Sequence, residues 1–177
     1  MLRAELDHVL APEFLGDLSE RPLPEVRALR DECTAVEQKV SYLRRLVHGR
    51  IDIVVGELGR RAAGGDPTDL GGLVEGLRDV LAENVHAPGH ARMVTRVAPP
   101  DVDEVTAELD AALGPRSLAS LPDLSDDEVR ALADGLAALD REYSERRRAL
   151  FDRLEVLGAE LTRRYGTGEA TVDSVLR

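Results

Sequence analysis

Cysteine, lysine and aromatic residues are scarce in this 177-residue sequence. Its one cysteine, Cys33, excludes an intrachain disulfide and a metal site built from several thiolates. With two Phe, three Tyr and no Trp, the core must be built mainly from Leu, Val and Ala, as in packed helices. Lys39 is the only lysine, so arginine supplies nearly every positive charge.

Positive charge is also in deficit, because 34 acidic residues outnumber 23 basic ones and give a net charge of −11. Binding to DNA or to an anionic membrane requires a cationic surface, so we expect neither. No run approaches the roughly 20 apolar residues of a transmembrane helix. The N-terminal stretch MLRAELDHVLAPEF lacks the apolar core of a signal peptide. We therefore expect a cytoplasmic protein whose partner is basic or whose ligand is small.

Two long stretches have helical periodicity without an internal proline. The first is predicted over 24–63 and ends at Gly64, a residue favoured just after a helix. The second is predicted over 126–165. It follows a capping-box pattern, in which Ser125 and Glu128 satisfy the first backbone N–H groups of the helix. Two helices of this length suggest a hairpin.

Shorter segments complete the predicted fold. We expect short helices over 69–83 and 102–113, and an irregular segment over 1–21 with a helical turn around Ala4 to Leu10. No sustained alternation of apolar and polar residues indicates strands. The prediction is one all-α domain over 1–177, a long antiparallel helical hairpin of the coiled-coil type with two shorter helices packed on it.

The most informative pattern is a stripe of polar residues in the first long helix. Steps of 4, 3, 4 and 4 place five residues on one face: Glu37, Ser41, Arg44, His48 and Asp52. The same spacing returns 103 residues later: Asp140, Ser144, Arg147, Phe151 and Glu155. A single such stripe is usually the solvated face of a helix. Its recurrence, with a matched serine between acidic residues, indicates a binding-site motif that occurs twice in the chain.

The first copy, Glu37-x3-Ser41-x2-Arg44-x3-His48-x3-Asp52, resembles the signature Glu-x3-Ser-x2-Arg-x3-Gln-x3-Asp of the RsiG-type anti-sigma factors of actinobacteria. The surrounding SYLRRLVHGRIDIVV is also similar. This resemblance implies a regulator of transcription that binds cyclic di-GMP, which could bind as an intercalated dimer, through the residues of both stripes. It also implies that the nucleotide-bound protein holds a sporulation sigma factor of the WhiG type inactive.

An antiparallel pairing with pseudo-two-fold symmetry is expected to place three pairs together: Arg44 and Arg147, Glu37 and Glu155, Asp52 and Asp140. Each of these pairs would bring like charges together, which is costly unless a ligand lies between them. Cyclic di-GMP has central phosphates and outer guanine donors. Carboxylates can accept the Watson–Crick donors of guanine, and arginine can fork onto its O6 and N7 or onto a phosphate.

The two copies differ where the family pattern has glutamine. His48 keeps a group that can hydrogen-bond, whereas Phe151 has none. We expect Phe151 chiefly to support the helix interface, so that Phe151→Ala lowers the melting temperature; the alternative is that its ring packs on a guanine. We therefore expect the first copy to hold the nucleotide more firmly, with Glu37 and Asp52 contributing more than Asp140 and Glu155.

Two other classes of function were weighed against this prediction. An enzyme is disfavoured, because the sequence has no Gly-rich phosphate loop, nucleophile and base pair, or metal-ligand cluster. His86 and His90 have helical spacing, but Pro88 between them disfavours a shared metal. The main alternative is a helical interaction module that binds its partner without any nucleotide. Its stripes would stay exposed and would not respond to ligand.

Overall fold

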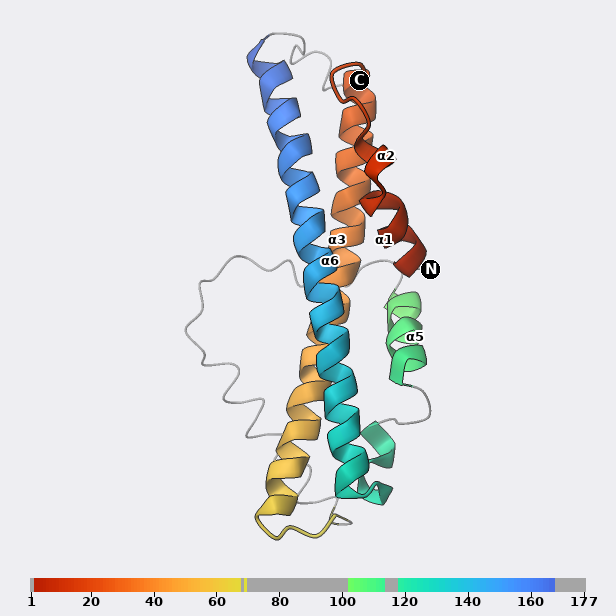
Figure 1. The fold of residues 1–177 in the computed structure, drawn as a ribbon, viewed down its shortest axis with the longest axis vertical. Coiled ribbons are helices and arrows are strands. Elements are labelled where there is room, and N and C mark those ends of the chain that lie inside the picture. The colour runs from red at the N-terminus through yellow and green to blue at the C-terminus, as the bar shows by residue number, and fades with distance from the viewer. Residues whose placement is uncertain (1, 68, 70–101, 114–117, 168–177) are drawn as a thin grey trace. The chain divides into compact units, whose positions relative to one another are not determined.

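The computed structural model describes residues 2–67, 69, 102–113 and 118–167. Every regular element in this part of the chain is a helix, which confirms the predicted all-α class (Figure 1). The helix predicted over 69–83 lies outside the described residues, as do His86 and His90.

The two long helices begin and end within one residue of their predicted bounds. Helix α3 spans Leu23–Ala62 and helix α6 spans Asp126–Gly166. The capping box is formed at the start of α6: the backbone N–H of Ser125 donates to Glu128 Oε2 (2.8 Å), and the backbone N–H of Glu128 donates to Ser125 Oγ (3.4 Å). The short helix α5 spans Val102–Leu113, as predicted.

The N-terminal segment is more helical than expected, since the sequence predicts only a helical turn around Ala4 to Leu10 there. Helix α1 spans Leu2–Leu10 and helix α2 spans Pro12–Leu15. Three apolar residues of α1 recur at helical spacing and are buried: Leu2, Leu6 and Val9. Pro12 begins a new helix because proline suits a first turn, where its missing N–H has no partner to lose. A short 3-10 helix, η1 (Leu118–Asp123), precedes α6.

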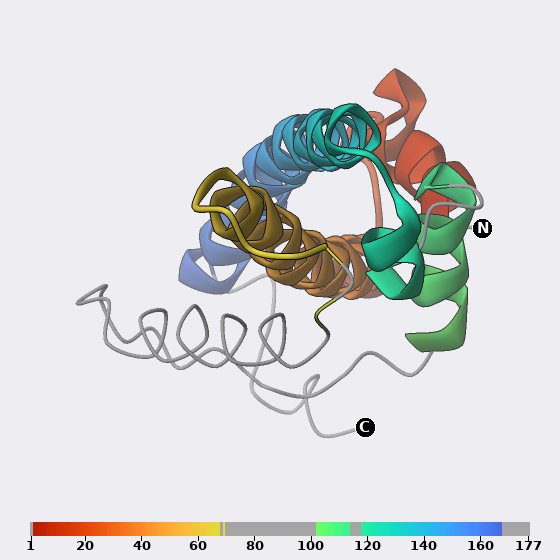
Figure 2. The same cartoon turned by 90° about the horizontal axis from the view of Figure 1, so that it is seen from below.

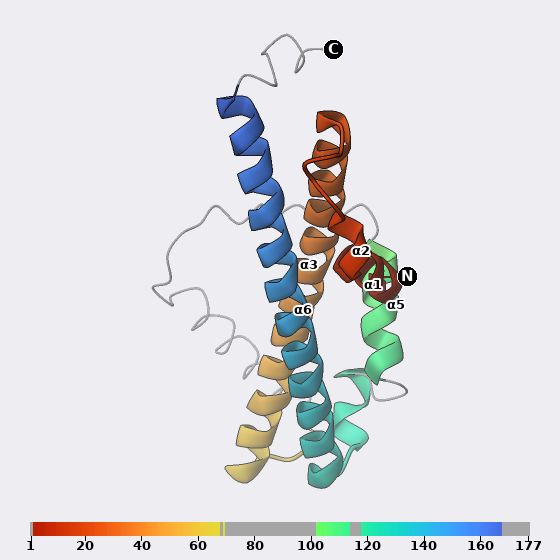
Figure 3. The same cartoon turned by 45° about the horizontal axis from the view of Figure 1, so that its top comes forward.

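The chain forms two compact units, and each contains part of both long helices. Unit 1 consists of Met1–Ser41 and Ser144–Arg177, and unit 2 of Tyr42–Tyr143. Within each unit the segments of α3 and α6 lie side by side and run antiparallel (Figure 1 and Figure 3). Their direct contacts confirm the hairpin arrangement of the two long helices.

A short helix packs on the long helices in each unit. In unit 1, Lys39 Nζ of α3 donates to Glu5 of α1 (3.0 Å), and Arg153 of α6 donates to the carbonyl of Leu10 (2.7 Å). In unit 2, Arg50 of α3 donates to Asp110 of α5 (3.0 Å). The short helices therefore occupy comparable positions in the two units.

The repeat seen in the stripes extends through both units. Glu37 and Asp140 are 103 positions apart, and many core residues have a buried equivalent at the same separation. In each of the following pairs both residues are buried: Leu2 and Val105, Leu6 and Leu109, Val26 and Val129, Cys33 and Leu136, Val36 and Leu139, Val40 and Tyr143, Val47 and Leu150, Val54 and Leu157. The chain thus carries two copies of a short-helix and long-helix repeat. Each unit combines the first half of one long helix with the second half of the other.

The end of α3 is bound to the segment that precedes α6. Glu57 accepts hydrogen bonds from Arg60 (2.8 Å) and Arg61 (2.6 Å), and we call these three residues the end cluster of unit 2. Arg61 also donates to the carbonyls of Leu121 and Leu124, both at 2.7 Å. Figure 2, which looks along the long helices, shows η1 leading into the start of α6.

The end of α6 has the equivalent cluster, 103 residues further on. Glu160 accepts hydrogen bonds from Arg163 (2.9 Å) and Arg164 (2.6 Å), and these three residues form the end cluster of unit 1. Arg164 donates to the carbonyls of Arg21 (2.7 Å) and Leu18, which precede α3. In each unit, therefore, a largely buried arginine joins the end of one long helix to the segment that begins the other.

The end cluster of unit 1 predicts a specific loss of stability in acid. Hydrogen bonds from Arg163 and Arg164 lower the pKa of Glu160 from 4.5 to about 2. A carboxyl whose pKa is lower in the folded state stabilises the fold above its unfolded pKa, and this contribution is lost as the pH falls towards the folded value. The difference in unfolding free energy between the native protein and Glu160→Gln should therefore be largest near pH 7 and should shrink between about pH 5 and pH 2.

Denaturant unfolding at a series of pH values measures this difference. Glu145→Gln, at an exposed position on the same helix, is the matched control and should show a much smaller dependence on pH. A difference for Glu160→Gln that stays constant from pH 7 to pH 2 would contradict the assignment.

Candidate functional site

In unit 2, stripe residues from both long helices meet in one polar cluster. Arg44 Nε of α3 donates to Asp140 Oδ1 of α6 (3.1 Å). His48 Nε2 lies 2.8 Å from the same oxygen and 3.5 Å from the Arg44 guanidinium. We call these three residues the stripe cluster of unit 2. The Arg44 and Asp140 side chains are 21% and 23% exposed, so solvent reaches both members of the ion pair.

Unit 1 contains the corresponding cluster. Arg147 Nε of α6 donates to Glu37 Oε1 (2.8 Å) and to Ser41 Oγ (2.7 Å) of α3, and Ser41 Oγ donates to Glu37 Oε1 (2.6 Å). These residues form the stripe cluster of unit 1. The Arg147 guanidinium carbon also lies 4.7 Å from the centre of the Phe151 ring.

The repeat relates the ion pairs of the two stripe clusters, whereas Ser41 of the unit 1 cluster has no counterpart in the unit 2 cluster. The pair of Arg147 and Glu37 corresponds to the pair of Arg44 and Asp140, 103 residues apart in each case. The main difference is at the position four residues after the arginine. There His48 hydrogen-bonds in unit 2, whereas the equivalent Phe151 in unit 1 offers its ring to Arg147.

In both units the stripe arginine is paired with an opposite charge on the other long helix. Arg147 lies against Glu37 in unit 1, and Arg44 lies against Asp140 in unit 2. These two pairs differ from the three expected ones, because the spacing within one helix does not say which residues of two helices meet, and the attraction between opposite charges favours them. A ligand is therefore not required to relieve repulsion around these arginines.

An open groove lies beside the stripe cluster of unit 2. Its volume is about 440 Å³, and its lining consists of His48, Ile51, Asp52, Ala137, Asp140 and Arg141. Asp52 and Asp140 share this groove, which places them in one site as the sequence predicted. Arg141 was not predicted as a site residue, because it lies outside the repeated spacing.

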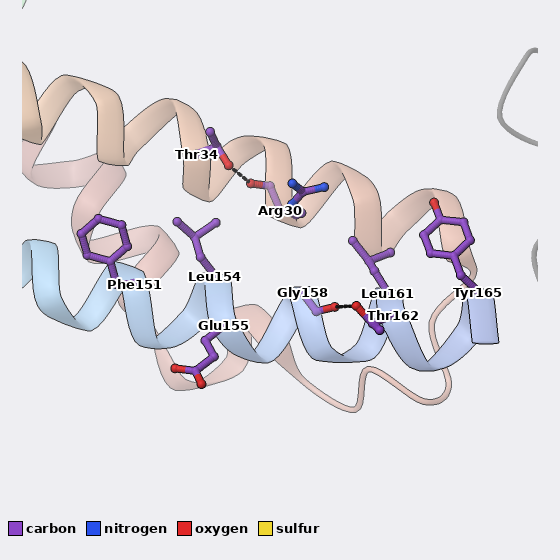
Figure 4. Close-up of a pocket in the computed structure, with 9 residues that line it drawn as sticks. All are labelled: Arg30, Thr34, Phe151, Leu154, Glu155, Gly158, Leu161, Thr162 and Tyr165. Carbon is purple, nitrogen blue, oxygen red and sulfur yellow. Dashed lines mark hydrogen bonds between the residues drawn. The ribbon is translucent and has the colours of Figure 1, made fainter. Parts of the chain in front are cut away.

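A second groove, of about 590 Å³, lies between α3 and α6 in unit 1 (Figure 4). Its lining comprises Arg30, Thr34, Phe151, Leu154, Glu155, Gly158, Leu161, Thr162 and Tyr165. Four of these correspond through the repeat to residues of the unit 2 groove: Thr34 to Ala137, Phe151 to His48, Leu154 to Ile51, and Glu155 to Asp52. Each unit therefore has a groove at the same position.

The unit 1 groove is longer and more apolar along α6. Phe151 and Leu154 project from α6 towards α3, while Glu155 lies on the other edge of α6 in this view (Figure 4). The hydroxyl of Thr162 donates to the carbonyl of Gly158 in its own helix (2.8 Å). Tyr165 lies at the far end, and its hydroxyl accepts a hydrogen bond from Arg27 Nε (2.9 Å). Sequence reasoning missed this extension because the first copy has no equivalent aromatic residue.

The predicted site residues thus divide between the two units. In unit 2 they are Arg44, His48, Asp52 and Asp140, and in unit 1 they are Glu37, Ser41, Ser144, Arg147, Phe151 and Glu155. Each unit contains residues from both stripes. If the residues of the first stripe bind the nucleotide more tightly, the tighter contacts will therefore be divided between the two grooves. Whether Glu37 and Asp52 contribute more than Asp140 and Glu155 stays a prediction.

The described residues have no group of His, Cys, Asp and Glu side chains that could hold a metal ion. Within the same ranges, no helix is long and apolar enough to cross a membrane. The polar and aromatic groups that line the two grooves are carboxylates, arginines, the hydroxyls of Thr34 and Thr162, the imidazole of His48 and the rings of Phe151 and Tyr165.

Comparison with known proteins gives a family match for the part of the chain that contains α3. Residues 12–81 match the model of the RsiG-like family, which confirms the resemblance drawn from the stripe of α3. The match includes the whole first copy, Glu37 to Asp52, whereas α6 lies outside it. No curated protein matches the chain. The match suggests anti-sigma factor function, for which the partner is a sigma factor.

The exposure of the stripe clusters predicts that their ion pairs contribute little to stability. Partly exposed pairs contribute about 0–1 kcal/mol, because solvent screens them. A double-mutant cycle with Glu37→Gln and Arg147→Met should therefore give a coupling free energy below about 1 kcal/mol. The cycle with Glu57→Gln and Arg61→Met is the control, and its coupling should be larger because both side chains are nearly inaccessible. Equal coupling free energies in the two cycles would contradict the claim that the Glu37–Arg147 pair opens more easily than the Glu57–Arg61 pair.

Proposed function

Because residues 12–81 belong to the RsiG-like family, we propose that this chain is an anti-sigma factor that binds cyclic di-GMP through its stripe residues. In this proposal the nucleotide-bound protein holds a WhiG-type sigma factor, of the sporulation class, inactive. The observation that carries the proposal is the repeated cluster. An arginine and a carboxylate from opposite helices lie beside an open groove once in each unit.

The ligand's chemistry suits the side chains of both grooves. Guanine presents N1–H and N2–H2 donors, for which Glu155 in unit 1 and Asp52 in unit 2 are acceptors. Arg147 and Arg44 can donate to guanine O6 and N7 or to a phosphate. Ser41 adds a hydroxyl within hydrogen-bond distance of Arg147 in unit 1. The same donors and acceptors recur, as recognition of a ligand with two like halves requires.

Nucleotide binding would exchange one set of charge pairs for another. In the free protein the stripe arginines are already held by Glu37 and Asp140. Opening these pairs costs little, since each is partly exposed. The freed arginine gains an anionic or carbonyl acceptor, and the freed carboxylate gains guanine donors. The preformed pairs therefore position the arginines at a small cost.

The charge of the chain supports a protein partner with basic surface. A net charge of −11 favours association with positively charged segments and disfavours direct contact with DNA. For the nucleotide to control this association, it must interact differently with the free and the sigma-bound protein. Exposed charges beside the grooves, such as Arg141, could provide such a difference, because a bound nucleotide would alter the surface there.

The first prediction concerns the stripe arginines. Arg44→Ala should weaken cyclic di-GMP binding by at least about 1.5 kcal/mol, or roughly tenfold, because a charge-assisted hydrogen bond is lost. Arg147→Ala should have a similar effect. The neighbouring Arg45→Ala and Arg148→Ala are matched controls, since they remove the same charge at positions off the stripe. Calorimetric titration measures the four affinities. Losses as large in the controls as in the stripe variants would contradict the placement of the site.

The second prediction concerns the sigma factor. A purified WhiG-type sigma factor should bind this protein tightly with cyclic di-GMP and weakly without it, as measured by biolayer interferometry at both nucleotide conditions. The alternative module, which needs no nucleotide, predicts equal binding under the two conditions. Equal binding would therefore reject the nucleotide-dependent mechanism even if the nucleotide itself binds.

A further inference from the structure

Phe151 is an exposed aromatic ring in a protein that has very few. Its residue surface is 43% exposed, although it lies between two packed helices and lines the unit 1 groove (Figure 4). The Arg147 guanidinium lies over the ring, at 4.7 Å from its centre. Since Arg147 covers part of the ring and the residue is still exposed, the remaining ring surface faces the open groove. Phe151 therefore does not act mainly as a buried filler of the helix interface.

The surroundings of Phe151 are those of a base-stacking site. Arg147 is itself held by Glu37 and Ser41, so the cation and the ring have a defined mutual arrangement before any ligand arrives. Glu155 lies one helical turn further along α6 and lines the same groove. A planar base stacked on the ring would thus lie close to the Glu155 carboxylate, which lines the groove, and to the Arg147 guanidinium, which lies over the ring.

Unit 2 does not offer the same surface. The equivalent residue, His48, is tied by its Nε2 to Asp140 at 2.8 Å, and its ring belongs to the polar cluster. The two grooves therefore differ in the way they can hold a base. Unit 2 offers hydrogen bonds at this position, and unit 1 offers a stacking surface.

We propose that Phe151 is a stacking platform for one guanine base of the nucleotide, in the groove of unit 1. This rests on the proposed binding of cyclic di-GMP and assigns a role to the residue where the second stripe departs from the family pattern. Aromatic stacking in nucleic-acid complexes is strong enough that its removal weakens binding by roughly 5- to 150-fold. Stacking also tolerates different bases, so guanine selectivity would come from Glu155 and not from Phe151.

The absence of tryptophan in the chain allows a direct test. Phe151→Trp introduces a single indole at the proposed platform, and guanine stacking quenches indole fluorescence. Tyr165→Trp is the matched control, because Tyr165 is 44% exposed and lines the far end of the same groove. Titration with cyclic di-GMP, without any sigma factor, should strongly quench the indole at 151 and leave the indole at 165 nearly unchanged.

A second variant separates stacking from stability. Phe151→Leu keeps an apolar side chain but removes the aromatic face, so it should weaken nucleotide affinity at least about fivefold while the melting temperature changes little. The native protein is titrated in parallel. If the native protein does not bind the nucleotide, the proposed function fails. If it binds but Phe151→Leu binds equally well, or if the indole at 151 is quenched only after a sigma factor is added, the stacking platform is rejected and the proposed function stands.

Discussion

An ion pair between an arginine on one long helix and a carboxylate on the other links the two helices in each unit. In unit 1 it joins Arg147 to Glu37, and in unit 2 it joins Arg44 to Asp140. Apolar helical stripes repeat at about every turn, so apolar packing alone does not decide which polar residues meet. Both pairs are partly exposed and contribute little to stability, so they can open for a ligand.

In each unit the two long helices are also joined at a second place. The end clusters around Glu57 and Glu160 join the last turns of each long helix to the segment before the other. The pair of Glu57 and Arg61 is much less accessible to solvent than the pair of Glu37 and Arg147. Its side chains are 1% and 4% exposed, against 15% for Glu37 and 33% for Arg147. Buried and exposed pairs of the same chemical type can therefore have different tasks. The buried pairs maintain the fold, whereas the exposed pairs can open and form hydrogen bonds with a ligand.

Much of the fold could be predicted from the sequence, because its signals are local. Long uninterrupted periodicity located α3 and α6, and the pattern of Ser125 and Glu128 located the start of α6. Helix α1 was predicted only as a helical turn because its apolar residues occur in a short segment next to Pro12, where local signals are weak. Their burial depends on packing against the long helices, and the clue to it was their equivalence to Val105 and Leu109 in the repeat.

The candidate site was only partly predictable for a similar reason. Spacing placed Glu37, Ser41 and Arg44 on one face, since that face is a property of a single helix. Which residue of the other helix meets them depends on how the two helices pack, and the structure pairs the stripe arginines with carboxylates. The end clusters were visible as repeated residues, but the carbonyl groups that Arg61 and Arg164 contact belong to segments distant in sequence. Their role could not be read from spacing.

The most direct test of the account is a calorimetric titration of the native protein with cyclic di-GMP, with cyclic di-AMP as the comparison nucleotide. The carboxylates of the two grooves match the N1–H and N2–H2 donors of guanine, and adenine lacks this pair of donors. The account predicts saturable binding of cyclic di-GMP and much weaker binding of cyclic di-AMP. No saturable binding of cyclic di-GMP, or equal affinity for the two nucleotides, would contradict it.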